Sequence, residues 1–331
     1  MQGAIIDGLQ YANWSEKIFR QMREGGVDCV HVTIAYHEDF REMVAIIAEW
    51  NRYFDQFAQW ILHAHTAADV IRAKEEGRTA IIFGFQNPSP IGDDISLIEI
   101  CHMLGVRFMQ LSYNNQSLMA TGCYEEQDCG ITRYGRQAIL EMNRVGLVVD
   151  MSHSAENSTL QAIEISTRPI AITHANPHWW HAALRNKSDT VIKALTQSGG
   201  MIGFSLYPHH LAGGTECTLQ SFCEMVARAV EKYGVSSLGL GSDLCQDQPD
   251  HVVTWMRNGK WSHEEDFGEG SVKNRGFPKQ PSWFRDNRDF GNISAGLKAA
   301  GFDTGEIAAI MGGNWLRFFV SSFGPQIQEA S

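Results

Sequence analysis

The sequence contains no long apolar run and no block of basic residues. Its 331 residues include 27 Lys and Arg against 38 Asp and Glu, a formal net charge of −11 at pH 7. Nucleic acid is bound by a basic face and an anionic membrane surface by a basic cluster. A bilayer span needs about 20 consecutive apolar residues. The composition therefore argues against nucleic-acid and membrane partners and indicates a soluble globular protein with a small-molecule substrate.

Paired cysteines are also missing. The seven cysteines are odd in number, scattered, and without any Cys-x-x-Cys spacing, which argues against a zinc knuckle and a disulfide framework. The first residues, Met-Gln-Gly-Ala-Ile-Ile-Asp, lack the basic start and apolar stretch of an export signal. We therefore expect a cytoplasmic protein with reduced thiols.

Short runs rich in Val, Ile and Leu recur along the chain, each followed by a longer segment that often has helical spacing. This alternation is typical of parallel βα units. Eight runs fit a strand: 4–9, 27–34, 79–85, 106–113, 147–153, 170–174, 201–207 and 237–243. We predict one α/β domain over residues 1–331, a (β/α)₈ TIM barrel. A doubly wound open sheet would give a similar pattern.

Several segments fall outside this repeat. Residues 37–60 read as one long helical stretch, and 288–300 and 304–319 read as two C-terminal helices. Residues 245–283, after the eighth strand, are rich in Gly and Trp and too irregular for a plain connection. We expect this long loop to cover the barrel mouth as a lid or to form a subunit interface, which leaves a homo-oligomer open.

Strand ends carry the candidate site, because the carboxyl ends of TIM-barrel strands share one mouth. Two consecutive apolar strands end in His153 and His174, and the eighth strand ends in Asp243. Imidazole is a common zinc ligand, and the carboxylate could take a proton from water or bind an ammonium group. A single residue of either type at a strand end is more often structural. Arg185, in a polar loop, could clamp a carboxylate or simply be solvated.

The order of these motifs resembles the membrane (renal) dipeptidase family of zinc metallopeptidases, over nearly the whole chain. The motifs are Asp150-Met-Ser-His153, Ile172-Thr-His174, Arg185-Asn186 and Gly239-Leu-Gly-Ser-Asp243. The resemblance implies a (β/α)₈ barrel that cleaves dipeptides with two zinc ions. By this resemblance His153 and His174 hold the second metal. Arg185 takes the substrate carboxylate, and Asp243 serves the catalytic water or the substrate amine.

The chain departs from the family pattern at the first metal. The family opens with Asp-Gly-His-x-Asp, and this chain reads Asp7-Gly8-Leu9-Gln10-Tyr11, so both ligands are missing. The bridging glutamate after the third predicted strand is Gln86, and the substrate-polarising histidine after the fourth is Tyr113. Without these carboxylates, a two-metal site loses the ligand charge that offsets the dehydration of the ions.

We therefore predict a hydrolase of a small amide or dipeptide, similar to a dipeptidase or amidohydrolase, with a degenerate metal site. At most one zinc ion would bind, to His153, His174 and Gln86, or no metal at all. The catalytic residues would be Asp243, as general base, and Tyr113, as a hydrogen-bond donor. Tyr113 and Arg185 would bind the substrate.

Two alternatives stay open on the same barrel. One is a metal-free enzyme with a different reaction. The other is a non-catalytic binding protein for a small cationic or zwitterionic ligand, whose ammonium group would be caged by aromatics near the mouth. The candidate cage residues are Trp179, Trp180, Trp255, Trp261 and Trp283. Tryptophans in a long loop more often anchor it against the barrel.

Overall fold

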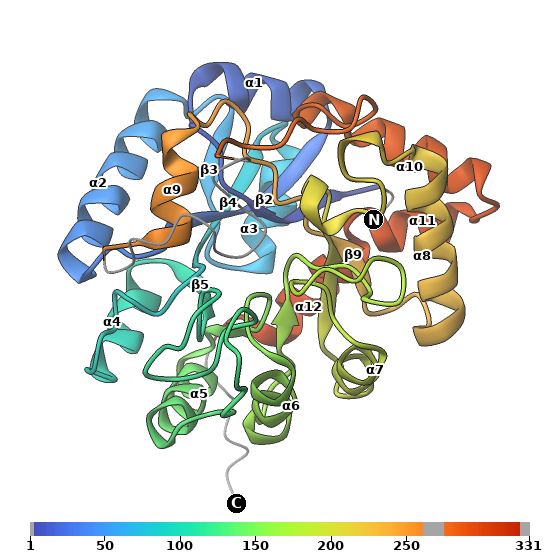
Figure 1. Ribbon diagram of the computed structural model, residues 1–331. Coiled ribbons are helices and arrows are strands. Elements are labelled where there is room, and N and C mark those ends of the chain that lie inside the picture. Colours follow the sequence, from blue (N-terminus) through green and yellow to red (C-terminus); the bar gives the residue numbers. More distant parts are fainter. Residues whose placement is uncertain (1–2, 261–274, 325–331) are drawn as a thin grey trace, which may run out of the picture.

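A closed parallel barrel surrounded by helices forms the body of the molecule (Figure 1). The computed structural model describes residues 3–260 and 275–324. Within these ranges eight strands make the cylinder in the order β1-β2-β4-β5-β6-β7-β8-β9, with β9 returning to β1. Their bounds are β1 Ile5–Gln10, β2 Val27–Ala35, β4 Thr79–Phe85, β5 Val106–Gln110, β6 Val148–Asp150, β7 Ala171–Ile172, β8 Met201–Phe204 and β9 Leu238–Leu240. The closed ring confirms the predicted (β/α)₈ TIM barrel over an open sheet.

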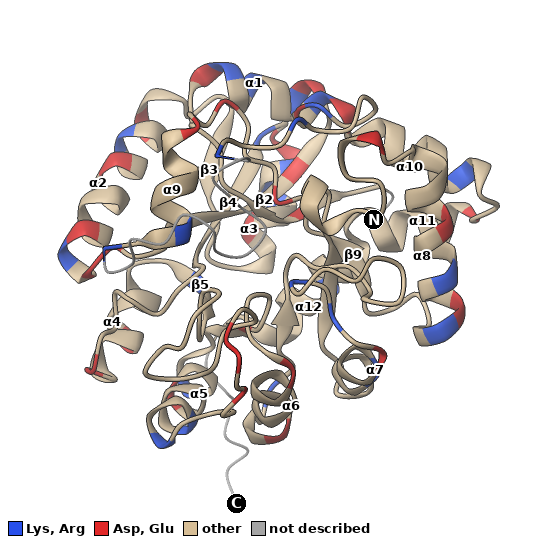
Figure 2. Cartoon of the chain, in the orientation of Figure 1, with Lys and Arg blue, Asp and Glu red and all other residues tan. Residues whose placement is uncertain are grey.

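Helices cover the outside of the barrel, and their apolar faces form the main core against the strands. Lys, Arg, Asp and Glu are mixed along the outer faces of these helices (Figure 2). The helices are α1 Glu16–Glu24, α2 Phe40–Gln56, α3 Ala67–Glu75, α4 Ser96–Met103, α5 Arg133–Val145, α6 Glu156–Ile165, α7 Asp189–Gln197, α8 Leu219–Tyr233, α9 His251–Asn258, α10 Phe290–Ala299, α11 Thr304–Ala308 and α12 Asn314–Ser322.

A ninth strand, β3 (Ile61–His63), follows α2 and was not predicted. It pairs in parallel with the first half of β4, whereas β5 pairs with the second half of β4. The predicted helix over 37–60 is correspondingly shorter, because α2 begins after the Asp39 cap and ends at Gln56. It follows α2 after a turn of four residues that contains no glycine, so the sequence does not separate it from the helical stretch before it.

The predicted helix over 304–319 is interrupted. A π-helical turn at Ala309–Gly313 separates α11 from α12. A Cβ on Gly312 would lie 2.5 Å from the carbonyl oxygen of Ala4, so glycine allows the turn to pack directly against the start of β1. Beyond the turn, Trp315 donates a hydrogen bond to the carbonyl of Leu240 (2.8 Å). This ring and its neighbours on α12 pack against the inner residues of the barrel.

The segment after β9 is partly described. Residues 245–260 contain α9, whereas 261–274, including Trp261, lie outside the described residues. None of the helices in the described ranges combines the length and the apolar character needed to cross a lipid bilayer.

Candidate functional site

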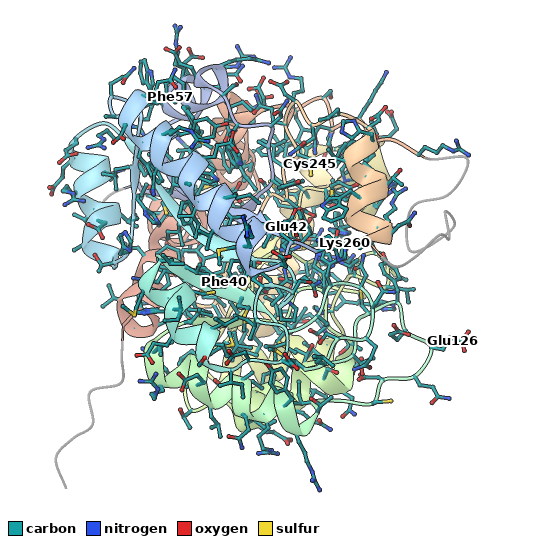
Figure 3. All side chains as sticks on the ribbon, turned by 90° about the vertical axis from the view of Figure 1, so that its left-hand side faces the viewer. Phe40, Glu42, Phe57, Glu126, Cys245 and Lys260 are labelled. Atoms are coloured by element: carbon teal, nitrogen blue, oxygen red, sulfur yellow. The ribbon has the colours of Figure 1, made fainter. Side chains whose placement is uncertain are left out.

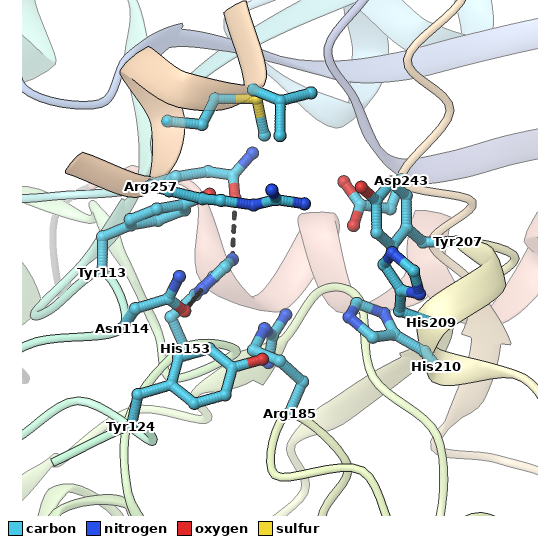
Figure 4. A pocket seen from close by; sticks show the side chains of 13 residues that line it. Tyr113, Asn114, Tyr124, His153, Arg185, Tyr207, His209, His210, Asp243 and Arg257 are labelled. Carbon is cyan, nitrogen blue, oxygen red and sulfur yellow. Dashed lines mark hydrogen bonds between the residues drawn. The ribbon is translucent and has the colours of Figure 1, made fainter. Parts of the chain in front are cut away.

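One pocket opens at the carboxyl ends of the strands (Figure 4). It brings together Gln86 after β4, Tyr113 after β5, His153 after β6 and Asp243 after β9, with Arg185 from the β7–α7 loop. The other residues that line it are Asn114, Tyr124, Tyr207, His209, His210, Val253, Met256 and Arg257. Five of the six predicted site residues therefore line one pocket. The sixth, His174, is fully buried and does not line the pocket, but it contacts His153.

His153 and His174 meet through their Nε2 atoms, which are 3.0 Å apart. Asp150 of β6 pairs with Ala171 of β7, so the residues that follow these two strands emerge side by side. His174 is fully buried and His153 is 5% exposed. Adjacent strands thus place the two rings together, as the sequence predicted.

The hydrogen bonds of the opposite ring nitrogens fix the tautomers. Nδ1 of His153 lies 2.7 Å from Oδ1 of Asn114, an acceptor, so this Nδ1 carries the hydrogen. Thr173 donates its hydroxyl hydrogen to Asp150 (2.6 Å) and therefore accepts one from Nδ1 of His174 (2.9 Å). Both neutral rings consequently carry a lone pair on Nε2, and these two nitrogens lie 3.0 Å apart.

The surroundings of His153 and His174 also favour the neutral form of each imidazole. Burial lowers the pKa of both His153 and His174 well below the usual value, and the nearby positive charge of Arg185 lowers each further. Protonation of either imidazole is therefore disfavoured, and both Nε2 atoms are available as electron-pair donors.

Gln86 supplies a third donor atom. Its amide nitrogen donates to Thr33 Oγ1 (2.8 Å) and Tyr36 Oη (2.7 Å). The amide oxygen is thereby turned toward His153, with Oε1 2.9 Å from Nε2. Two imidazole nitrogens and one amide oxygen, all lone-pair donors, converge in this buried space. This set fits one cation of the zinc class, although it contributes no negative charge.

Buried groups behind the histidines hold them in place. Asp150 accepts hydrogen bonds from Thr173 and Ser152, and burial raises its pKa above the usual value. Thr173 then links this carboxyl group to His174. Such a relay orients an imidazole and strengthens it as a ligand.

Gly241 allows the backbone just after β9 to approach the hydrogen-bonded group Asp150, Thr173 and His174 closely. A Cβ at this position would lie 1.7 Å from the carbonyl oxygen of Thr173. The backbone just after β9 therefore runs directly against the residue before His174, with no room for a side chain between them.

The β7–α7 loop clamps the turn that carries His153. Arg185 donates hydrogen bonds to the carbonyl oxygens of Ser152 and His174. Lys187 donates to the carbonyls of Met151 (2.9 Å) and Ser154 (2.7 Å), and burial lowers its pKa to about 7. Both side chains therefore support the histidine-bearing backbone, and Arg185 also lines the pocket.

Tyr113 and Asp243 occupy different walls of the pocket. The Tyr113 ring stacks on His153, with centroids 4.1 Å apart. Asp243 has a left-handed backbone (φ 55°), which Asp tolerates better than most residues, and its N–H donates to the carbonyl of Leu9 (3.0 Å). Its carboxylate faces the cavity from the side of Tyr207 (Figure 4).

The first-metal positions of the family pattern do not reach this pocket. Leu9 is fully buried, and Tyr11 lines a neighbouring cavity. The Tyr11 ring packs edge-on against Tyr36 (4.7 Å), which packs edge-on against Tyr113 (5.0 Å). These apolar and aromatic side chains do not fit a second metal ion.

Several lining residues were missed or left without a role. His209 and His210 form a doublet just after β8, a signal that sequence reading could have used. Asn114 and Tyr124 lie in an irregular loop, and Arg257 lies on α9, where no strand periodicity points to the mouth. Of the four tryptophans in the described ranges that were candidates for a cage, none lines the pocket.

Comparisons with known proteins identify the family and the fold. A family model described as membrane dipeptidase (peptidase family M19) matches residues 12–255. Dipeptidase tcpJ of Claviceps purpurea is 29% identical over 228 residues, covering 68% of this chain and 52% of that protein. The chain thus spans about half the length of the curated relatives it matches.

Solved structures are similar over nearly the whole chain. An amidohydrolase from Pseudomonas aeruginosa superposes with a TM-score of 0.90 at 30% identity, covering 97% of each chain. A metallopeptidase from Rhodobacter sphaeroides, liganded with a phosphinate mimic of the dipeptide L-Ala-D-Ala, has a TM-score of 0.76 at 16% identity, covering 97% of this chain and 100% of that one. The second likeness concerns the fold.

Proposed function

Since this chain belongs to the membrane dipeptidase family (peptidase family M19), we propose that it hydrolyses a dipeptide or a similar small amide with one zinc ion. The observation that carries the proposal is that Nε2 of His153 lies 3.0 Å from Nε2 of His174 and 2.9 Å from the Gln86 amide oxygen. The dipeptide mimic bound by the structural relative supports a dipeptide substrate.

His153, His174 and Gln86 would hold the ion. When bound, zinc polarises a carbonyl group and makes a water molecule more acidic. Leu9 and Tyr11 provide no ligand for a second ion, so the proposal departs from the two-metal arrangement that the resemblance implied.

The remaining residues would act on the substrate. Arg185, buried at the base of the pocket, would bind the terminal carboxylate, because its planar guanidinium matches a carboxylate. Asp243 would accept the proton of the attacking water. Tyr113, stacked on His153, would donate a hydrogen bond to the oxygen that gains negative charge during attack.

The first test is metal stoichiometry together with hydrolysis. We expect about one zinc per chain by elemental analysis, and cleavage of Ala-Ala that stops on chelation and returns with added zinc. His153→Ala and His174→Ala should lose both the metal and the activity. His178→Ala, at an exposed histidine outside the pocket, is the matched control and should keep both.

Other results would overturn the proposal in different ways. Two zinc ions per chain would restore the two-metal arrangement. Hydrolysis that persists without metal would favour the metal-free enzyme, and ligand binding without any turnover would favour a binding protein. The cytoplasmic location, the lid role of 245–283 and a homo-oligomer stay predictions.

A further inference from the structure

Asp7 of β1 is a carboxyl group that the proposed hydrolysis does not use. Its side chain is fully buried and does not line the pocket, and burial raises its pKa to about 6. A buried carboxyl group is costly unless hydrogen-bond donors surround it. The donors that surround Asp7 therefore indicate what this residue stabilises, and they lead to the segment that carries Asp243.

Both oxygens of Asp7 accept hydrogen bonds from Ser242, the residue before Asp243. Oδ1 accepts from the Ser242 N–H (2.6 Å), and Oδ2 accepts from the Ser242 hydroxyl group. The hydroxyl oxygen accepts in turn from the N–H of Leu244 (3.2 Å). Asp7 therefore holds the backbone just before Asp243 and, through the Ser242 hydroxyl group, the backbone just after it.

The backbone of Asp243 adopts a conformation that few residues other than glycine adopt. Its φ of 55° lies in the left-handed region. Its N–H donates to the carbonyl of Leu9 (3.0 Å), and Cys245, labelled in Figure 3, donates from Sγ to the Asp243 carbonyl (3.5 Å). These two contacts hold the peptide groups of Asp243 itself, whereas Asp7 holds the residue from which the chain enters this turn.

Gln10 supports Asp7 from the side opposite to Ser242 in the sequence. Its Nε2 donates both to Asp7 Oδ2 (2.8 Å) and to Oδ1 of Asn287 (2.8 Å). Within the described chain, every hydrogen-bond partner of the Asp7 side chain is a donor. A carboxylate can accept from all of them, whereas an amide at position 7 would turn one acceptor into a donor.

We propose that Asp7 is a positioning residue that aims the Asp243 carboxylate into the pocket by holding residues 242 and 244. This inference rests on the proposed function, since that function makes Asp243 the general base. A general base must lie within hydrogen-bond reach of the proton that it accepts. A displacement of about 1 Å at such a group can cost about a hundredfold in rate.

The experiment uses Asp7→Asn, which keeps the size of the side chain and replaces one acceptor oxygen with a donor. On the zinc-loaded chain, well above the pKa of Asp7, we expect kcat for Ala-Ala to fall at least about tenfold. KM should stay within about threefold, because Arg185 is unchanged. Zinc content should match that of the parent chain. Ser242→Ala, which removes only the hydroxyl link, should lower kcat less.

Asp28→Asn is the matched control. Asp28 is a second buried carboxyl group (3% exposed), near the start of β2, where it accepts from the Ile5 N–H (3.0 Å) and pairs with Lys74 (2.8 Å). It lies at the end of the strands away from the pocket. Its substitution should lower stability and leave kcat within about twofold of the parent. Equal losses of kcat in Asp7→Asn and Asp28→Asn would overturn the inference, because both would then reflect stability alone.

Hydrogen exchange of the backbone separates this inference from the proposed function. In Asp7→Asn, amides in residues 241–246 should exchange at least about tenfold faster than in the parent chain, and in Asp28→Asn they should not. If no dipeptide is cleaved but this difference is found, the hydrolase proposal fails while the positioning of Asp243 stands. Unchanged exchange or an unchanged kcat in a folded Asp7→Asn variant would overturn the inference. If that variant does not fold, Ser242→Ala decides by the same two measurements.

Discussion

At the scale of single residues, Gln86 sets the charge of the proposed zinc site. Its amide oxygen is 2.9 Å from His153 Nε2. Its amide nitrogen donates hydrogen bonds to the hydroxyl groups of Thr33 and Tyr36. Gln86→Glu would add a negative charge beside the cation, and both hydroxyl groups could donate to it. We expect zinc affinity to rise at least about tenfold, or about 1.4 kcal/mol, measured by competition with a chromophoric chelator.

The control is Gln59→Glu, which makes the same change at an exposed position outside the pocket. Its zinc affinity should equal that of the parent chain. An unchanged affinity in Gln86→Glu would show that residue 86 does not contact the metal.

Single-residue positions at strand ends were predictable from the sequence. His153, His174 and Asp243 follow strands whose carboxyl ends must meet in a barrel. The orientation of His153 was not predictable, because it depends on Asn114, a loop residue with a left-handed backbone (φ 60°). Loop conformations of this kind have no periodic signal in the sequence.

At the scale of secondary-structure elements, close contact between the segments after β7 and β9 supports the site. Gly241→Ala would place a methyl group 1.7 Å from the Thr173 carbonyl oxygen, a backbone atom that cannot rotate away. We expect a loss of about 3 kcal/mol or more in the free energy of unfolding, measured by urea denaturation. Zinc binding should weaken as well, because the shift would move the residue next to His174.

Gly291→Ala provides the comparison, since a Cβ there meets no atom within 4 Å and the residue lies in α10. Its stability should stay within about 1 kcal/mol of the parent, with alanine favoured in a helix. If the two substitutions changed the free energy of unfolding equally, the barrel would have room for a methyl group at Gly241.

Elements were predictable where the apolar pattern was long. The strands of the barrel were located to within a few residues because each lies in a buried run between helices, whereas β3 follows α2 after only four residues with no glycine between them. The break between α11 and α12 depends on the contact of Gly312 with Ala4. That contact is tertiary, and the helical spacing on either side of it continues without interruption.

At the scale of the whole molecule, buried histidines should make stability depend on pH. Burial lowers the pKa of His31 and His102 to about 4 and that of His63 to about 3. These groups take up protons in the unfolded chain below about pH 6.5, but not in the folded chain until lower pH. The free energy of unfolding should therefore fall as pH drops from 6.5 toward 4.

For His31 the gap between 6.5 and about 4 is about 2.5 pH units, or roughly 3 kcal/mol at about 1.4 kcal/mol per unit. Asp7 acts in the opposite direction. Burial raises its pKa to about 6, so the folded chain binds its proton first and gains stability as pH falls through that value. Asp150, whose pKa burial also raises, acts in the same direction as Asp7, and these two carboxyl groups offset only part of the effect of the buried histidines.

Urea denaturation at several pH values between 4 and 7 measures this slope. His31→Asn keeps a donor for the Gly8 carbonyl that His31 Nδ1 contacts (2.7 Å), but it cannot titrate. The variant should show a shallower dependence on pH than the parent chain. The same slope in both proteins would mean that His31 titrates normally in the folded state.

Three tyrosine rings in edge-on contact near the mouth limit how the site could accept a second metal ion. Tyr11, Tyr36 and Tyr113 each pack against the next ring, and Tyr36 also supports the amide of Gln86. The substitutions Leu9→His and Tyr11→Asp would therefore remove one of these three rings and place a polar group against the two aromatic rings that remain. In the proposed one-metal site, a second metal ion would therefore require changes at the partners of these residues as well as at positions 9 and 11.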